Sequence, residues 1–207
     1  MNVGRPLQFN PDKALGSAMQ LFWNNGYEST SLQDLLTAMK LSKSSFYQAF
    51  KSKKQLFLNT ILSYQALLVD DLLLQLKQAD TGKAFIENLF SCVAEETVGV
   101  DARRGCLLMN TASEFAQTDD EIADLVSESL VKITAIFERA VVQAQQEGDI
   151  SANKDAHDLA VYLLSNMSGL KNMVKAGADK ETITSIVDTI LLTLGDPSIT
   201  QVTSKND

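Results

Sequence analysis

The chain has 207 residues, of which 18 are Lys or Arg and 26 are Asp or Glu, so its formal net charge is −8. A composition with 45% apolar residues, three prolines and ten glycines excludes a disordered or fibrous protein. The net charge alone argues against a nucleic-acid binder, but it is unevenly distributed: residues 1–58 carry +4 and the rest of the chain carries −12.

No unbroken apolar run reaches the roughly 18 residues that a membrane span needs. The first residues lack the apolar segment of a secretory signal. We therefore expect a soluble, cytoplasmic protein without a membrane partner. Its two cysteines, Cys92 and Cys106, are expected to be reduced thiols.

Three short helices are predicted near the N-terminus. Apolar residues at helical spacing indicate the first over residues 11–24. Ser31, with Asp34 three residues later, forms a capping box for the second helix. Ser42 caps a third helix after a tight turn, so a helix, a turn and a helix fall within about residues 31–50.

Longer helices follow in the rest of the chain. Ser52 and Gln55 form a capping box for a fourth helix that continues to about Ala79, and Thr118 with Glu121 forms another box. The remaining helices are predicted at about residues 83–98, 105–116, 119–147, 156–176 and 180–194. Because there are about nine helices and no sustained alternation, the sequence predicts an all-α protein.

The last two predicted helices carry wide apolar stripes. The stripe residues are Leu159, Leu163, Leu170 and Val174 in the first of them, and Ile183, Ile186, Val187, Ile190, Leu191 and Leu194 in the second. Two copies of this helix pair suit a four-helix interface between subunits. The alternative is that both stripes face the core of their own chain.

The helix-turn-helix segment carries residue types that a DNA-binding protein needs. Such a motif presents the start of its second helix to the major groove, while nearby side chains hold phosphates. The polar residues that point away from its apolar face are Lys43, Ser44, Ser45, Tyr47 and Gln48. The groups placed to meet phosphates are Lys51, Lys53 and Lys54 and the hydroxyls of Thr30 and Ser31. On charge alone, a solvated corner of a helical bundle is an equal alternative.

Two stretches, residues 21–32 (LFWNNGYESTSL) and 41–53 (LSKSSFYQAFKSK), closely resemble the DNA-binding domain of the TetR family of bacterial transcriptional repressors. The resemblance covers about residues 5–60. It departs from the family pattern at Lys40, where many members have Gly, at Ala49 and at Lys54. It implies a three-helix DNA-binding domain over residues 1–58 and a larger helical ligand-binding and dimerisation domain over 59–196, followed by a polar tail over 197–207.

The resemblance also implies roles for individual residues. Tyr47 and Lys53 would hold phosphates. Lys43, Ser44, Ser45 and Gln48 would meet base edges, where Gln48 can pair with adenine. Arg5 resembles the N-terminal extensions that reach a minor groove.

A second resemblance lies farther along the chain. Residues 103–115 (RRGCLLMNTASEF) resemble the Arg-Gly-Cys-Leu start of the sixth helix in one TetR subfamily, a helix that lines the ligand cavity in the family. The implied inducer-binding residues are Phe90, Val93, Cys106, Met109, Asn110, Ser113, Phe137, Tyr162, Asn166 and Met173. Ordinary core packing is the alternative for such positions. No cofactor and no metal are expected.

Cys106 has two interpretations. It lies at a predicted helix N-terminus beside Arg103 and Arg104, and both features favour a reactive thiolate. It is therefore a candidate sensor of electrophiles or oxidants. The alternative is that it is a small buried packing residue.

Two other functions compete with DNA binding. An enzyme is poorly supported, because the chain has one histidine, His157, and lacks a Cys/His cluster with metal spacing or a Gly-rich phosphate loop. A dimeric ligand-binding scaffold that does not read DNA is disfavoured by Lys43, Tyr47 and Lys53. The sequence predicts a homodimeric repressor that binds a palindromic or near-palindromic operator, dimerises through residues 156–194, and is released by a small-molecule, electrophile or oxidant inducer.

Overall fold

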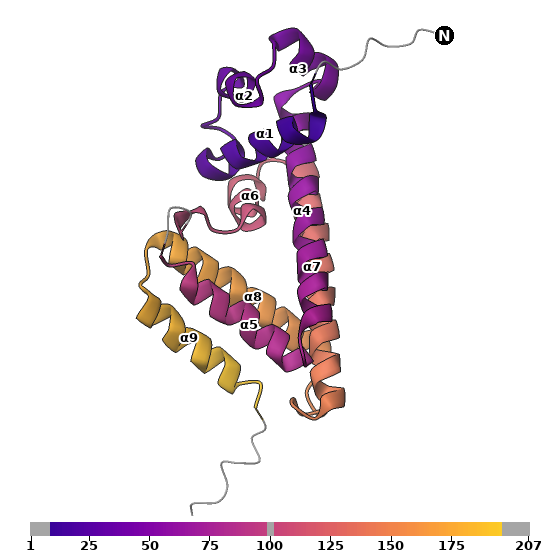
Figure 1. Ribbon diagram of the computed structural model, residues 1–207, viewed down its shortest axis with the longest axis vertical. Helices are drawn as coiled ribbons and strands as arrows, with labels where there is room; N and C mark the ends of the chain where they lie inside the picture. The colour runs from indigo at the N-terminus through magenta and orange to yellow at the C-terminus, as the bar shows by residue number, and fades with distance from the viewer. Residues whose placement is uncertain (1–8, 99–101, 196–207) are drawn as a thin grey trace, which may run out of the picture. The chain divides into compact units, whose positions relative to one another are not determined.

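The computed structural model describes residues 9–98 and 102–195, and every regular element in these ranges is helical. In chain order (Figure 1) the elements are α1 (Pro11–Asn25), α2 (Leu32–Met39), α3 (Lys43–Phe50), α4 (Lys53–Gln78), α5 (Gly82–Glu95), the 3₁₀ turn η1 (Ala102–Arg104), α6 (Leu107–Phe115), α7 (Asp120–Glu147), α8 (Ala156–Ala176) and α9 (Lys180–Leu192). The predicted all-α class is confirmed. Arg5 and the tail over residues 197–207 lie outside the described ranges.

Some helix ends differ from the sequence prediction for local reasons. Asp119, not Thr118, caps α7, because the Asp119 carboxylate accepts the N–H of Ile122 at 3.3 Å. Thr81 caps α5, so that helix begins at Gly82. Helix α6 begins only after Gly105, whose φ of 65° is incompatible with a right-handed helix.

The chain packs as two compact units, which are described separately. The first unit comprises Met1–Leu68 and Leu107–Ser127, so it holds α1, α2, α3, α6 and the N-terminal turns of α4 and α7. Its fully buried large side chains are Phe22, Leu35, Phe46, Leu56, Phe57, Ile61, Leu107, Leu108 and Ile122. By packing, α6 therefore shares a core with the N-terminal helices.

The second unit comprises Val69–Cys106 and Glu128–Asp207. Helix α5 approaches α7 closely at Gly82, where a Cβ atom would lie 2.2 Å from the carbonyl oxygen of Ala140. The Gly82 N–H donates to the Glu147 carboxylate at 2.8 Å. Helix α9 packs against α5 and α8.

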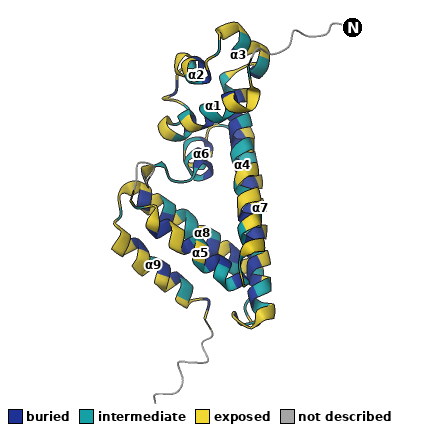
Figure 2. Ribbon diagram, in the orientation of Figure 1, coloured by how far each residue is buried: buried dark blue, intermediate teal, exposed yellow. Residues whose placement is uncertain are grey.

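The apolar stripes of α8 and α9 belong mainly to the core of this second unit. The buried stripe residues are Leu163, Leu170 and Val174 in α8 and Ile183, Val187, Ile190 and Leu194 near or in α9 (Figure 2). The other stripe residues, Leu159, Ile186 and Leu191, are half-buried. Packing within the chain thus covers most of both stripes, and dimerisation through residues 156–194 stays a prediction. Exposed apolar side chains remain on another face of α8, at Val161, Tyr162 and Met173.

One described helix, α4, is long and apolar enough to cross a membrane by length and composition. The sequence prediction missed this because it considered only unbroken apolar runs, whereas α4 intersperses polar residues among its apolar ones. A core helix of a soluble protein passes the same test. Because α4 contributes Leu56, Phe57, Ile61, Leu72 and Leu76 to buried cores, its composition is weak evidence for a membrane span.

Candidate nucleic-acid interface

Side-chain caps and one left-handed residue define the helix-turn-helix. The capping box of α2 is confirmed: the Asp34 N–H donates to Ser31 Oγ at 3.1 Å, and the Ser31 N–H donates back to the Asp34 carboxylate at 2.9 Å. The Asp34 carboxylate also accepts the Ser31 hydroxyl at 2.6 Å; this bond, followed by the bond from the Ser31 N–H, lowers the pKa of Asp34. Lys40 ends α2 at φ 55° and ψ 44°, a left-handed conformation that glycine adopts most readily. Ser42 then caps α3 by accepting the Ser45 N–H at 3.1 Å.

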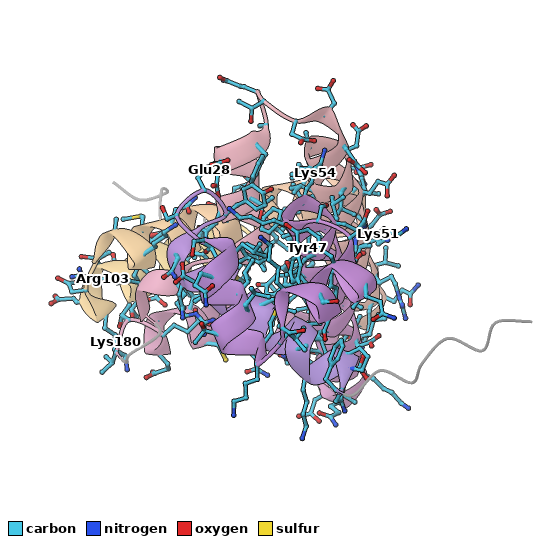
Figure 3. All side chains as sticks on the ribbon, turned by 90° about the horizontal axis from the view of Figure 1, so that it is seen from above. Glu28, Tyr47, Lys51, Lys54, Arg103 and Lys180 are labelled. Atoms are coloured by element: carbon cyan, nitrogen blue, oxygen red, sulfur yellow. The ribbon has the colours of Figure 1, made fainter. Side chains whose placement is uncertain are left out.

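The start of α3 presents polar side chains to solvent. Lys43, Ser44, Tyr47 and Gln48 are exposed, whereas Phe46 and Phe50 of the same helix are buried. Ser45 is half-buried, and its hydroxyl lies 2.9 Å from the hydroxyl of Ser42. Figure 3 shows Tyr47 on α3 and Lys51 directly after it. The structure thus leaves four of the five predicted groove-facing side chains accessible.

The prediction that the Thr30 hydroxyl meets a DNA phosphate is corrected. Its side chain is completely buried, and its hydroxyl donates to the carbonyl oxygen of Gly26 at 2.7 Å. Its N–H donates to the carbonyl of Tyr27 at 3.2 Å. Both donors are therefore used inside the protein, and Thr30 has none for a phosphate. Ser31 is exposed, but its hydroxyl donates to Asp34 at 2.6 Å.

The lysines around the start of α4 have different environments. Lys51 is exposed. The Lys53 ammonium lies 4.1 Å from the ring centroid of Tyr27, which is a cation–π geometry. Lys54 was predicted to bind a phosphate, and this is corrected: its ammonium pairs within the protein with the carboxylates of Asp119 and Glu121, both at 2.8 Å. Hydrogen bonds to these carboxylates raise the pKa of Lys54.

Glu114 is a polar contact that the sequence did not predict. Its carboxylate accepts the N–H of Tyr27 at 3.2 Å and the N–H of Glu28 at 3.0 Å, so α6 is bonded to the turn between α1 and α2. The ring of Tyr27 also packs against Phe57 and Phe115 at centroid distances of 4.9 and 5.3 Å. Burial is the main reason that the pKa of Tyr27 is raised. Nothing in the local sequence pattern links two segments so distant along the chain.

The predicted inducer-binding residues lie in different environments. Phe90, Val93 and Phe137 are core residues of the second unit. Three residues of α6, Met109, Asn110 and Ser113, belong to the first unit. Asn166 is half-buried, whereas Tyr162 and Met173 are exposed on α8. The assignment of these residues to an inducer site stays a prediction.

Cys106 is the residue directly before α6 and is partly exposed. The Arg-Gly-Cys-Leu segment therefore lies at Arg104–Leu107, across the junction between η1 and α6. Among the described residues, no group of three or more His, Cys, Asp or Glu side chains could hold a metal ion.

A basic N-terminal segment in which a short helix, a tight turn and a second capped helix with an exposed polar face follow one another is the arrangement of helix-turn-helix DNA-binding proteins. Comparison with known families agrees. The family model "Bacterial regulatory proteins, tetR family" matches residues 14–60, and the model "Tetracyclin repressor-like, C-terminal domain" matches residues 83–190, more than half of the chain. The chain belongs to the TetR family. It is a DNA-binding transcriptional regulator, not an enzyme.

Individual relatives span nearly the whole chain. The HTH-type transcriptional repressor ComR of Escherichia coli is 28% identical over 91% of this chain and 90% of its own length. The uncharacterized HTH-type transcriptional regulator YezE of Bacillus subtilis is 26% identical over 93% of this chain and 100% of its own length. A cysteine mutant of the TetR family transcriptional regulator CifR, complexed with a 26-base-pair double-strand operator DNA, superposes with a TM-score of 0.80. It is 26% identical over 92% of this chain and 100% of that chain.

Proposed function

We propose that the chain is a homodimeric repressor that binds a palindromic operator through the exposed start of α3 and is released by a small-molecule inducer. The observation that carries this proposal is the set of exposed polar side chains, Lys43, Ser44, Tyr47 and Gln48, on a helix whose other face is buried. The operator complex of the similar protein CifR supports it. Tyr47 and Lys53 are assigned to phosphates, and Lys43, Ser44, Ser45 and Gln48 to base edges.

The proposed dimer interface includes the outward face of α8. Tyr162, Gly169 and Met173 are spaced seven and four residues apart and so share one helix face. A Cβ at Gly169 would meet nothing within 4 Å, so a partner helix has room to approach there. Leu192 near the end of α9 adds an exposed apolar side chain. Two-fold pairing supplies the second recognition helix that a palindromic operator requires.

The inducer site is proposed from α6 and its surroundings. The Arg104–Leu107 segment supports a place in the TetR subfamily with an Arg-Gly-Cys-Leu sequence before or at the sixth helix. Cys106 remains a candidate for reaction with an electrophile or oxidant because it is partly exposed. An inducer need only bind better to the conformation that does not fit the operator.

Fluorescence anisotropy with DNA from beside the chain's own gene tests the DNA assignment. Lys53→Ala should weaken binding to all sequences and reduce the slope of log K against log salt by about 1, because one phosphate contact is lost. Gln48→Ala should cost about 1–3 kcal/mol on the operator and relax the sequence preference at one position of each half-site.

Lys77→Ala is the matched control, because it removes an exposed lysine from the second unit. Its operator affinity and salt slope should stay near those of the wild type. Absence of any operator shift by a protein that sediments as a dimer would instead support the scaffold alternative.

A further inference from the structure

The last turn of α6 holds the backbone of the turn between α1 and α2. The two carboxylate oxygens of Glu114 accept hydrogen bonds from the successive N–H groups of Tyr27 and Glu28, at 3.2 and 3.0 Å. Successive N–H groups that converge in this way form a small anion-binding concavity. Each bond involves a charged acceptor, so each is stronger than a bond between neutral groups.

Gly26 shapes this turn. Its φ of 79° lies in the region that favours glycine, and a Cβ there would lie 3.5 Å from Glu114 Oε2. The carboxylate therefore lies directly against the turn. Because the turn leads into α2, and α2 leads through Lys40 into α3, its position sets where the helix-turn-helix begins.

The same turn contacts a residue of the proposed DNA interface. Phe115, the neighbour of Glu114 on α6, packs edge-on against the ring of Tyr27 at 5.3 Å. The Lys53 ammonium lies over that ring, 4.1 Å from its centroid. Glu114 and Phe115 thus hold the backbone and the ring of Tyr27, and Tyr27 in turn supports Lys53.

We propose that Glu114 is a positioning residue for operator binding: it fixes the turn between α1 and α2 that leads into the helix-turn-helix, without touching DNA. The proposal rests on the proposed function, because it assumes that α3 faces the operator. Helix α6 is nine residues long and begins directly after Cys106. A displacement of α6 would withdraw both the carboxylate and the Phe115 ring from Tyr27, which gives α6 a direct means to weaken DNA binding.

Hydrogen exchange tests the contact itself. In Glu114→Gln the side chain keeps one oxygen acceptor but presents an NH₂ group to the second N–H, so one bond is lost. We expect exchange at the amides of Tyr27 and Glu28 to accelerate about tenfold in Glu114→Gln, because one of the two bonds is lost, and further in Glu114→Ala, because both are lost. A tenfold change corresponds to about 1.4 kcal/mol. Glu28→Gln is the matched control, since it removes one negative charge from the same turn and leaves the Glu114 contact in place.

Operator and non-specific DNA affinities separate positioning from a general structural role. Both Gln variants remove one negative charge near the DNA-binding domain, so both should bind random-sequence DNA at least as well as the wild type. Only Glu114→Gln should lose operator affinity, by about tenfold at a temperature where circular dichroism shows both variants fully folded. A merely destabilised protein would lose affinity for both DNAs together.

Two results would overturn the proposal. One is unchanged exchange at Tyr27 and Glu28 in both Glu114 variants. The other is equal operator affinity of Glu114→Gln and Glu28→Gln. Lys53→Ala keeps the two proposals apart: if it bound the operator like the wild type, the phosphate assignment would fail, while a selective loss of operator affinity in Glu114→Gln would still support the positioning role.

Discussion

His157 is the one histidine of the chain, and its Nδ1 lies 2.9 Å from the Glu138 carboxylate. This hydrogen bond is the main reason that the pKa of His157 is raised, and Asp155 and Asp158 raise it further. The folded state therefore holds the proton more tightly than the unfolded state does. The resulting contribution to stability is fully present below the ordinary histidine pKa of about 6.5, and it is lost as the pH rises through the folded-state value.

An NMR titration of the His157 ring checks this directly. We expect a pKa above the ordinary value in the wild type. Glu138→Gln should lower it without restoring the ordinary value, because Asp155 and Asp158 remain. If the pKa of His157 were the same in Glu138→Gln as in the wild type, the Glu138 contact would not be what raises it in solution.

Single residues also show what sequence reasoning can and cannot reach. The caps at Ser31 and Ser42 follow from local chemistry, since each accepts an N–H from a residue three positions later. Lys40 adopts the left-handed conformation although it is not a glycine, and this conformation lets the N–H groups of Lys40 and Leu41 bond back to the carbonyls of Thr37 and Leu36 at 3.2 and 3.0 Å. Thr30 could not be excluded from the interface by pattern, because its burial depends on how α1, α2 and α4 pack.

At the scale of helices, the contact between α5 and α7 depends on the absence of a side chain at Gly82. A Cβ there would lie 2.2 Å from the Ala140 carbonyl oxygen and 2.7 Å from the Ala144 nitrogen, both backbone atoms that cannot rotate away. We expect Gly82→Ala to lower the free energy of unfolding by about 1–3 kcal/mol, the usual cost of overpacking.

Gly16→Ala is the matched control for that substitution. A Cβ at Gly16, inside α1, would meet nothing within 4 Å, so this variant should gain about 0.5–1 kcal/mol from better helix propensity. Urea unfolding of both variants measures the difference. Equal stability of the two would mean that α5 and α7 are not in close contact at this point.

The order and type of the helices were predictable because each carries its own 3.6-residue pattern and caps. The contacts between helices were not. The apolar stripe of α9 predicted that Ile183, Val187 and Ile190 are buried, but periodicity cannot distinguish the core of the same chain from a partner subunit. Glu114 was missed for the same reason, since only the fold brings α6 to Tyr27.

At the scale of the whole molecule, the distribution of charge agrees with DNA binding better than the net charge does. Residues 1–58 carry +4 and the rest of the chain carries −12. An acidic remainder repels phosphates, which limits contact with DNA to the basic domain and reduces non-specific binding. The affinity should fall steeply with salt because the attraction comes mainly from phosphate contacts.

The proposed dimer interface on the outward face of α8 can be tested by substitution. Tyr162 and Met173 are exposed on α8 around an open Gly169, so a charge at both positions should prevent a second copy from packing there. We expect Tyr162→Asp combined with Met173→Asp to sediment as a folded monomer at concentrations where the wild type is dimeric. Operator affinity should fall at least a hundredfold, on the order of 3 kcal/mol, because a monomer reads only one half-site.

Val131→Asp provides the comparison for this double variant, because Val131 is also exposed but lies on α7. It should remain dimeric and bind the operator normally. If the double variant also stayed dimeric, the subunits would have to pair through a different surface. That other surface would then set the distance between the two recognition helices. The outward face of α8 would have no part in operator binding.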